Sequence, residues 1–252
     1  MSEQIKQQEK IYDEIYSIDQ EASYGYNFTK DALTRYLRDR RLYKALKVLA
    51  NKNQNTVGWK VLSLCGGVGG EGVFFVNNGF EDVTVSDISD NSLKICNQFA
   101  PSIKTVKQNA ESLDFPDNSF DIVVVQDGLH HLPRPVSGFT EMLRVAKKAV
   151  VVIEPYNGFI GKLIGTEWEV AGDAMNYVFR WNKNMVSQTV KSFLLKNYSS
   201  IKVIRCWDHG LLVSKIVGLL PKSLQLKAAK LIYAMLKPFN IVGNMMVTVV
   251  IK

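Results

Sequence analysis

The sequence has few of the features that mark secreted, disulfide-bonded or membrane-spanning proteins. Its three cysteines, Cys65, Cys96 and Cys206, are far apart and form no CxxC pair, so we expect free thiols and no bound metal. No run of about 18 apolar residues is present, so we expect no transmembrane helix. The polar start, MSEQIKQQEK, lacks the apolar segment of a signal peptide, and we expect a cytoplasmic protein.

Acidic residues are almost absent from the last part of the chain. The whole chain has 31 Lys and Arg and 24 Asp and Glu, a net charge of +7. Residues 180–252 contain 12 Lys and Arg but one acid, Asp208. Such an excess attracts anionic partners, whether a phosphorylated substrate, a lipid headgroup or a nucleic acid, but it is also consistent with solubilising charge on exposed helices.

Short apolar segments alternate with helical ones through the middle of the chain. Hydrophobic residues make up 46% of the sequence, which is enough for a substantial core. Continuous apolar runs are typical of parallel strands buried on both faces. The order predicts an α/β fold, a Rossmann-like, mostly parallel sheet with helices on both faces. The expected strands are 60–64, 83–85, 103–106, 120–125 and 149–153.

Both ends of the chain extend this core. Residues 1–50 have helical periodicity with an aromatic break at 23–28, after which Thr29 is the expected N-cap. The later elements should be a loop-rich segment at 156–181, a helix at 184–196, a strand at 201–207, two helices within 211–238 split at Pro221, and a last, antiparallel strand at 245–251.

We expect one domain, 1–252, in three parts. Residues 1–56 should form an N-terminal helical extension or lid, and 57–155 the cofactor-binding core. Residues 156–252 should form an acceptor-side region with a helical insertion at 211–238.

A glycine-rich turn follows the first predicted strand. Gly66, Gly67, Gly69 and Gly72 would let the backbone turn sharply and approach a ligand at the start of a helix, where N–H groups are free. Asp87, about 20 residues later, is placed to accept hydrogen bonds from ribose hydroxyls, or instead to cap the next helix. The pattern predicts an adenosine cofactor without separating nicotinamide from S-adenosylmethionine.

The stretch 108–132 separates the two. Asn109 and Ala110 follow the third predicted strand, FPDNSFD leads into the fourth, and LHHL follows at 129–132. Glu154-Pro155 follows the fifth. Together these segments resemble the class I S-adenosylmethionine-dependent methyltransferases, in particular the ubiquinone and menaquinone branch. The resemblance covers residues 57–155.

The resemblance implies that S-adenosylmethionine is the cofactor. Two positions depart from the family pattern: Ser63 stands where an acid is usual, and Cys65 where glycine is usual. In the family, the residues after the third strand contact the adenine, and a polar residue like Gln126 can bind the methionine end. The matching positions are Asn109 and Ala110, and the whole predicted cofactor site is Gly66, Gly67, Gly69, Asp87, Ile88, Asn109, Ala110 and Gln126.

Candidates for catalysis follow the fourth predicted strand. His130 and His131 are candidate general bases, because histidine accepts protons near neutral pH and ligands bind at the carboxyl edge of such sheets. Either could instead serve packing, and Asp127 could orient the acceptor. Aromatic residues are candidates for acceptor recognition (Tyr156, Trp168, Trp181) and for the lid (Tyr24, Tyr26, Phe28), or for the core.

The segment 211–238 is basic and amphipathic. It could touch a membrane surface and present a lipid-linked acceptor, close over the site, pair with another subunit, or pack on the sheet. No nucleic-acid module is present, so a nucleic-acid partner is not expected.

We therefore expect a methyltransferase acting on a small-molecule, lipid-type or sugar-type acceptor. One alternative is a catalytically silent S-adenosylmethionine-binding protein, suggested by Ser63 and Cys65. Another is an NAD(P)-dependent oxidoreductase, although 108–132 has no role in that chemistry.

Overall fold

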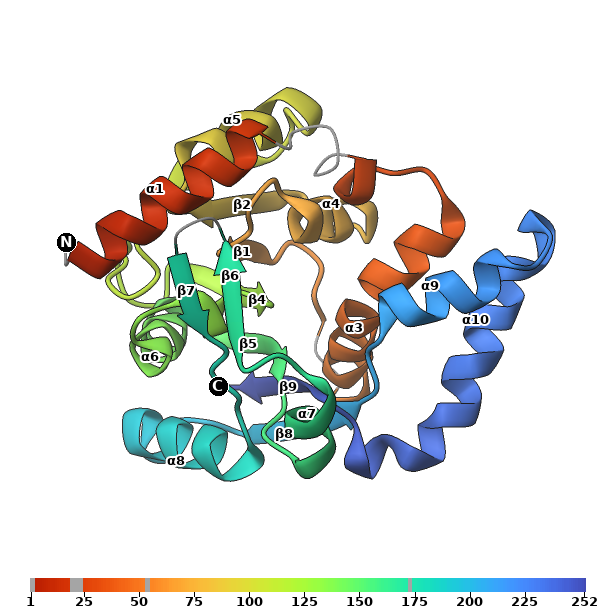
Figure 1. Cartoon of the computed structure of the whole chain (residues 1–252). Helices are drawn as coiled ribbons and strands as arrows, with labels where there is room; N and C mark the ends of the chain where they lie inside the picture. The colour runs from red at the N-terminus through yellow and green to blue at the C-terminus, as the bar shows by residue number, and fades with distance from the viewer. Residues whose placement is uncertain (1–2, 19–24, 53–54, 172–173) are drawn as a thin grey trace.

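A seven-stranded sheet forms the centre of the structure (Figure 1). The computed structural model describes residues 3–18, 25–52, 55–171 and 174–252. The strand order is β3-β2-β1-β4-β5-β9-β8, and β9 runs antiparallel to both neighbours, so the predicted mostly parallel sheet with an antiparallel last strand is confirmed. The bounds are β1 (Lys60–Leu64), β2 (Asp82–Asp87), β3 (Lys104–Lys107), β4 (Phe120–Gln126), β5 (Ala146–Pro155), β8 (Ser200–Cys206) and β9 (Met245–Ile251).

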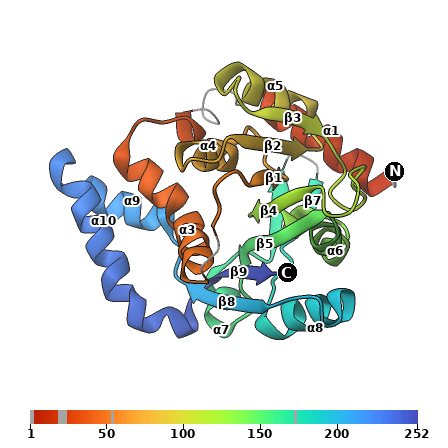
Figure 2. The ribbon, with the colours of Figure 1, turned by 180° about the vertical axis from the view of Figure 1, so that it is seen from behind.

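Helices cover both faces of the sheet because its strands are apolar on both sides. Ile122 and Val124 of β4 pack into one core, and Val123 and Val125 into the other. The first core takes side chains from α3 (Ala32–Asn51), α4 (Gly70–Asn77) and α5 (Asp90–Phe99). The second takes them from α6 (Pro135–Val145) and α8 (Lys183–Leu194). Helix α1 (Glu3–Ile18) lies against α5 (Figures 1 and 2).

Two helix starts test the capping predictions. Ser89 caps α5, since its Oγ accepts a hydrogen bond from the Ser92 amide at 3.1 Å. The prediction of Thr29 as the cap of the second helix is wrong. Asp31 takes that role and accepts from the Thr34 amide at 2.8 Å, while Thr29 Oγ1 accepts from the Asp31 amide.

The segment after β5 is more regular than the sequence indicates. It contains α7 (Phe159–Ile164) and an antiparallel hairpin of β6 (Trp168–Ala171) and β7 (Ala174–Tyr177). These elements are too short for periodicity to reveal them. The hairpin lies beside the η1 turn (Leu129–His131), which follows β4.

The last helices lie on the outer side of α3, away from β2 and β3 (Figures 1 and 2). Helices α9 (Gly210–Gly218) and α10 (Lys222–Leu236) are split at Pro221 as predicted, and η2 (Lys237–Val242) leads into β9. Val213, Val217 and Ala229 pack with Leu37 of α3 in a small separate cluster. No helix in the described ranges is both long and apolar enough to cross a bilayer.

Candidate functional site

A cavity lies at the carboxyl ends of β1, β2 and β4, with α1 along one side. It encloses about 700 Å³, part of it open to solvent. The predicted residues Asp87, Ile88, Asn109, Ala110 and His131 all line it. The structure thus brings the end of the second strand, the loop after the third and the turn after the fourth to one place. Cys65, Asp127 and three side chains of α1, Gln8, Tyr12 and Tyr16, complete most of the wall.

Asp87 fixes the glycine-rich turn. Its Oδ2 accepts a hydrogen bond from the Gly67 amide at 2.8 Å, and its Oδ1 accepts from the Ser89 amide at 2.9 Å. Burial raises the pKa of this carboxyl, while the two amides work in the opposite direction. Asp87 therefore joins the turn to the start of α5 and keeps its carboxylate at the cavity wall.

The three predicted glycines have different neighbours. A Cβ on Gly66 would come within 2.8 Å of Ser63 Oγ, and one on Gly69 would collide with Cys96 Sγ. These two glycines are explained by packing, and their contact with a cofactor stays a prediction. Gly67, with φ +52°, would place a Cβ 2.7 Å from the Tyr16 hydroxyl beside the cavity.

Two non-glycine residues of the cavity wall have left-handed backbone. Cys65 after β1 has φ +51°, and Asp127 after β4 has φ +55°. Such a conformation costs on the order of 1 kcal/mol for each residue and is concentrated at functional sites. Cys65 thus stands in a conformation suited to glycine, the residue usual there in the family it resembles. Burial raises the pKa of its thiol, which stays neutral.

Helix α1 supplies the aromatic residues nearest the cavity. The Tyr12 ring meets the His131 ring edge-on at 5.7 Å, and the Gln8 amide donates to the His131 carbonyl. The predicted lid residues lie elsewhere: Tyr26 is half exposed, Phe28 stacks on Phe99, and Tyr24 is outside the described residues. The helical spacing of Tyr12 and Tyr16 indicated an inward face but not that this face lies over the site.

Glu154 holds the turn that carries both histidines. Its Oε1 accepts hydrogen bonds from the Gly128 and Leu129 amides, and its Oε2 lies 2.6 Å from His130 Nδ1. Burial alone would lower the pKa of His130, but the Glu154 carboxylate raises it above its ordinary value. His130 is therefore a buried residue behind the cavity wall, and the Glu154 carboxylate favours its protonated form.

The pKa of His131 is shifted in the opposite direction from that of His130. Burial, and then the neighbouring His130, lower its pKa to about 3, so its ring is neutral near pH 7. Its Nδ1 lies 3.4 Å from Glu169 Oε2 of β6 and 3.3 Å from Asn176 Nδ2 of β7. The β6–β7 hairpin therefore positions the histidine that faces the cavity, a role that the sequence did not reveal.

Two clusters place three metal-binding side chains within 4.8 Å of one another. One is His130, His131 and Glu169, and the other is Glu9, Asp13 and Asp90. In the first, the histidines contact Glu154, Glu169 and Asn176; in the second, Lys107 pairs with Glu9 and Asp90, and Asp13 accepts from Ser89. Because these contacts account for both clusters, we assign a metal to neither.

Buried acceptor atoms without a partner lie beside the glycine-rich turn. Gln126 donates to Glu71 Oε1 at 3.3 Å, while its own Oε1 and Ser63 Oγ have no hydrogen bond. Burial raises the pKa of Glu71 to about 7. A buried polar atom without a partner costs about 1–3 kcal/mol, so these atoms suit a donor carried by a ligand, such as an ammonium group.

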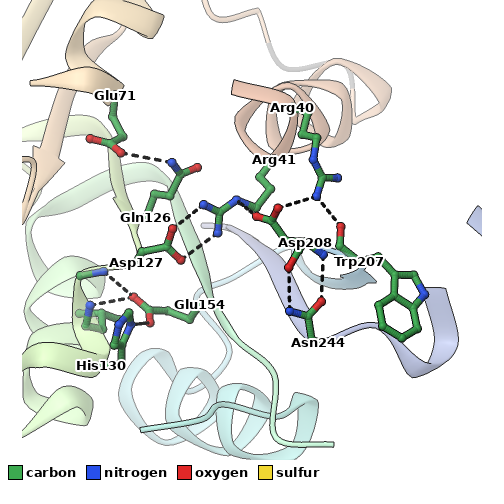
Figure 3. A network of polar contacts seen from close by, with 12 residues as sticks. Arg40, Arg41, Glu71, Gln126, Asp127, His130, Glu154, Trp207, Asp208 and Asn244 are labelled. Carbon is green, nitrogen blue, oxygen red and sulfur yellow. Dashed lines mark hydrogen bonds and ion pairs between the residues drawn. The ribbon is translucent and has the colours of Figure 1, made fainter. Parts of the chain in front are cut away.

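A chain of buried charges links the cavity to the C-terminal helices (Figure 3). Arg41 of α3 donates to both carboxylate oxygens of Asp127, and its Nε lies 2.8 Å from Asp208 Oδ2. Arg40 pairs with Asp208 at 2.8 Å and donates to the Trp207 carbonyl. Burial works against the charge of Arg41, but the two carboxylates raise its pKa. The sequence prediction used the leucines of this helix and missed its arginines.

The aromatic residues predicted for acceptor recognition lie away from the cavity wall. Trp181 is fully buried between Phe139 and Phe179, so it is a core residue. Trp168 is half exposed and packs on Tyr177. Tyr156 lies under the guanidinium of Arg205.

Similar sequences cover the middle of the chain. Residues 64–153 match a family described as "Methyltransferase domain". The chain is 37% identical over 98 residues to the ubiquinone/menaquinone biosynthesis C-methyltransferase UbiE of Shewanella pealeana, a match that covers 36% of this chain and 39% of the relative. It is 30% identical over 139 residues to the demethylmenaquinone methyltransferase of Paenarthrobacter aurescens, covering 55% and 53%. The matches thus span about half or less of these relatives.

Similar structures cover nearly the whole chain. A Thermotoga maritima methyltransferase, described as a possible histamine N-methyltransferase, has a TM-score of 0.60 at 15% identity and covers 96% of this chain and 99% of its own. An S-adenosylmethionine-dependent methyltransferase of Mesorhizobium loti has a TM-score of 0.56 at 12% identity and covers 86% and 100%. At such low identity these likenesses show the fold.

Proposed function

We propose that this chain, which carries a class I S-adenosylmethionine-dependent methyltransferase domain in residues 64–153, methylates a small aromatic acceptor of the quinol type. The observation that carries the proposal is one cavity shared by Asp87, Ile88, Asn109, Ala110 and His131. Four of these residues are the predicted cofactor contacts, and the fifth supplies a neutral imidazole beside them.

The cavity fits the cofactor at both ends. Asp87 would accept the ribose hydroxyls, with Ile88, Asn109 and Ala110 around the adenine. The unpartnered Gln126 Oε1 and Ser63 Oγ would accept hydrogen bonds at the ammonium end, near Gly66, Gly67 and Gly69. When bound, S-adenosylmethionine supplies a methyl group that is bonded to a positively charged sulfur. The sulfur is the leaving group, and its charge means that it needs no further activation.

The acceptor class follows from the chemistry of the cavity and from the relatives. The two relatives are named for reactions on quinone precursors. Ring carbon methylation requires a nucleophilic carbon, which a phenolic hydroxyl provides when it loses its proton. The methylated carbon then loses its own proton as the ring becomes aromatic again. The neutral imidazole of His131 lines the cavity, and the Glu169 carboxylate lies 3.4 Å from its Nδ1, so the pair can take up that proton.

His131 and His130 have separate roles in this proposal. His131 accepts the proton of the acceptor hydroxyl, and Glu169 stabilises the imidazolium that results. His130, whose protonated form Glu154 favours, holds the turn that carries His131. Asp127, fixed by Arg41, holds the loop between them and the glycine-rich turn in place. Alignment of donor and acceptor supplies the remaining acceleration.

Labelling tests the proposal directly. The whole chain is incubated with methyl-labelled S-adenosylmethionine and either a reduced, unmethylated naphthoquinol or a fractionated cell extract. Label is expected in the quinol or in a hydrophobic small-molecule fraction. Cofactor binding without label in any fraction would support the silent-binder alternative. A melting temperature raised by NAD(P)H but not by S-adenosylmethionine would support the oxidoreductase.

A further inference from the structure

Exposed apolar side chains gather on the C-terminal helices. Of the 23 large apolar side chains that are exposed among the described residues, eleven lie between residues 211 and 242. Leu219 is 89% exposed and Leu211 is 83% exposed. Large contiguous apolar surfaces are uncommon on soluble monomers and mark interaction sites. We call this set the apolar edge: Leu211, Leu212, Ile216, Leu219, Leu220, Leu224, Leu231, Met235, Phe239, Ile241 and Val242.

The apolar edge is not needed to hold the helices on the protein. Helices α9 and α10 are attached through other residues, Val213, Val217 and Ala229, which pack on Leu37. On α10, Leu224, Leu231 and Met235 are spaced by seven and four residues and therefore share one side of the helix. That side faces solvent. The helices thus have two apolar surfaces: one packs on α3, and the other, the exposed stripe, faces solvent.

The charges around the apolar edge have a single sign. Lys215, Lys222, Lys227, Lys230 and Lys237 are exposed between its members, and residues 209–252 contain no acid. Lysine can lay its aliphatic stem along an apolar surface and keep its ammonium group in a polar layer. Apolar side chains flanked by lysines alone are the pattern of helices that lie in the interface of an anionic bilayer.

We propose that residues 210–242 dock on the surface of a lipid bilayer that contains anionic headgroups. The apolar edge enters the boundary of the acyl chains, and the lysines contact the headgroup phosphates. Charge decides against a second copy of this chain as the occupant. Two copies meeting at this face would bring five lysines of each copy together, with the Asp31 carboxylate near Lys222 as the acid beside them.

The docking surface is connected to the cavity by buried groups. Arg40 lies 3.6 Å over the Tyr233 ring of α10. Asp208, two residues before α9, contacts both Arg40 and Arg41, and Arg41 holds Asp127 at the cavity (Figure 3). The inference that the bilayer supplies the acceptor rests on the proposed function; docking itself does not. An acceptor of low water solubility would then be methylated at the membrane surface.

Vesicle sedimentation of the whole chain tests docking. Phosphatidylcholine vesicles with phosphatidylglycerol should carry the protein down, and pure phosphatidylcholine vesicles should carry down much less. Leu219→Glu combined with Leu231→Glu should lower the bound fraction at least about tenfold. Leu163→Glu combined with Phe193→Glu, which adds the same charges at exposed apolar positions on α7 and α8, should leave it unchanged. Replacing Lys215, Lys227 and Lys237 by Gln should remove the preference for anionic vesicles.

Three outcomes would overturn the proposal. The first is no sedimentation with either vesicle, and the second is equal loss in both double variants. The third is a dimer in sedimentation velocity that the Leu219 and Leu231 changes dissociate, without vesicle binding, which would make this face a contact between two copies. Circular dichroism checks that each variant is folded. Calorimetry with S-adenosylmethionine on the same samples separates a failure of docking from a failure of the proposed function.

Discussion

The cavity and the apolar edge use opposite means of binding. At the cavity, buried carboxylates, imidazoles and guanidiniums are paired one by one at set distances, and two wall residues hold left-handed backbone. At the apolar edge, leucines and lysines stand exposed on the outside of two helices. The first arrangement suits one small ligand in one orientation. The second suits an extended surface without fixed geometry. Changes in one region should therefore leave the other intact, except where Arg40 and Arg41 join them.

The largest effect is expected where the two regions meet. Arg41→Met removes a buried guanidinium and leaves the partly exposed carboxylate of Asp127 without its cation, while Asp208 keeps Arg40. Removing one partner of such a buried group costs about 3–5 kcal/mol. We expect the free energy of unfolding in urea to fall by about 3 kcal/mol. Arg35→Met, at an exposed position of the same helix, is the control, and an equal loss in both variants would refute the assignment.

His131→Ala should lower turnover without weakening cofactor binding. Loss of a general base typically lowers the rate about a hundredfold. We expect kcat to fall by about that factor while the affinity for S-adenosylmethionine and for anionic vesicles is kept. His209→Ala is the matched control outside the cavity wall. Undiminished kcat in the His131 variant would remove this residue from the mechanism.

Asp87→Asn should weaken cofactor binding without disturbing docking. The amide is the same size as the carboxylate, but its NH₂ group would face one of the backbone amides of Gly67 and Ser89, and the charge is lost. Hydrogen bonds to charged groups contribute about 1.5–3 kcal/mol, so affinity should fall at least about tenfold. Calorimetry measures this loss. Asp90→Asn, exposed at the start of α5, should bind as the unchanged protein does.

The smallest effect is on acid stability. His131 has a folded pKa of about 3, below the ordinary 6.5, so the unfolded state binds its proton first. Its contribution to stability is therefore complete above pH 6.5 and declines as the pH falls toward 3. Between pH 7 and pH 5 the free energy of unfolding of the His131→Gln variant should fall by about 1–2 kcal/mol less than that of the unchanged protein. The same difference in free energy of unfolding between the two proteins at pH 7 and at pH 5, measured by urea unfolding, would contradict this.

The central fold could be predicted because its signals are local. The strands at 60–64 and 245–251 were predicted with the bounds that the structure has, since apolar runs mark their limits. The carboxyl-edge rule for parallel sheets was enough to bring Asp87, Asn109 and His131 together.

The remaining parts depend on contacts that are distant in sequence. Periodicity shows that Tyr12 and Tyr16 face inward, but not that α1 lies over the cavity. Arg40 and Asp208 are 168 residues apart, and no local pattern announces their pairing. Glu169 reaches His131 only because β6 and β7 form a hairpin, and each of these strands has just four residues.

The close approach of Tyr16 to Gly67 makes two positions that are distant in the sequence depend on each other. A side chain at position 67 would have to adopt positive φ and also displace the phenol that rests against the glycine. Shortening residue 16 would relieve the crowding but not the backbone cost. A protein that loses this glycine must therefore change both the turn at position 67 and the packing of α1 at Tyr16. One substitution is not enough for both changes.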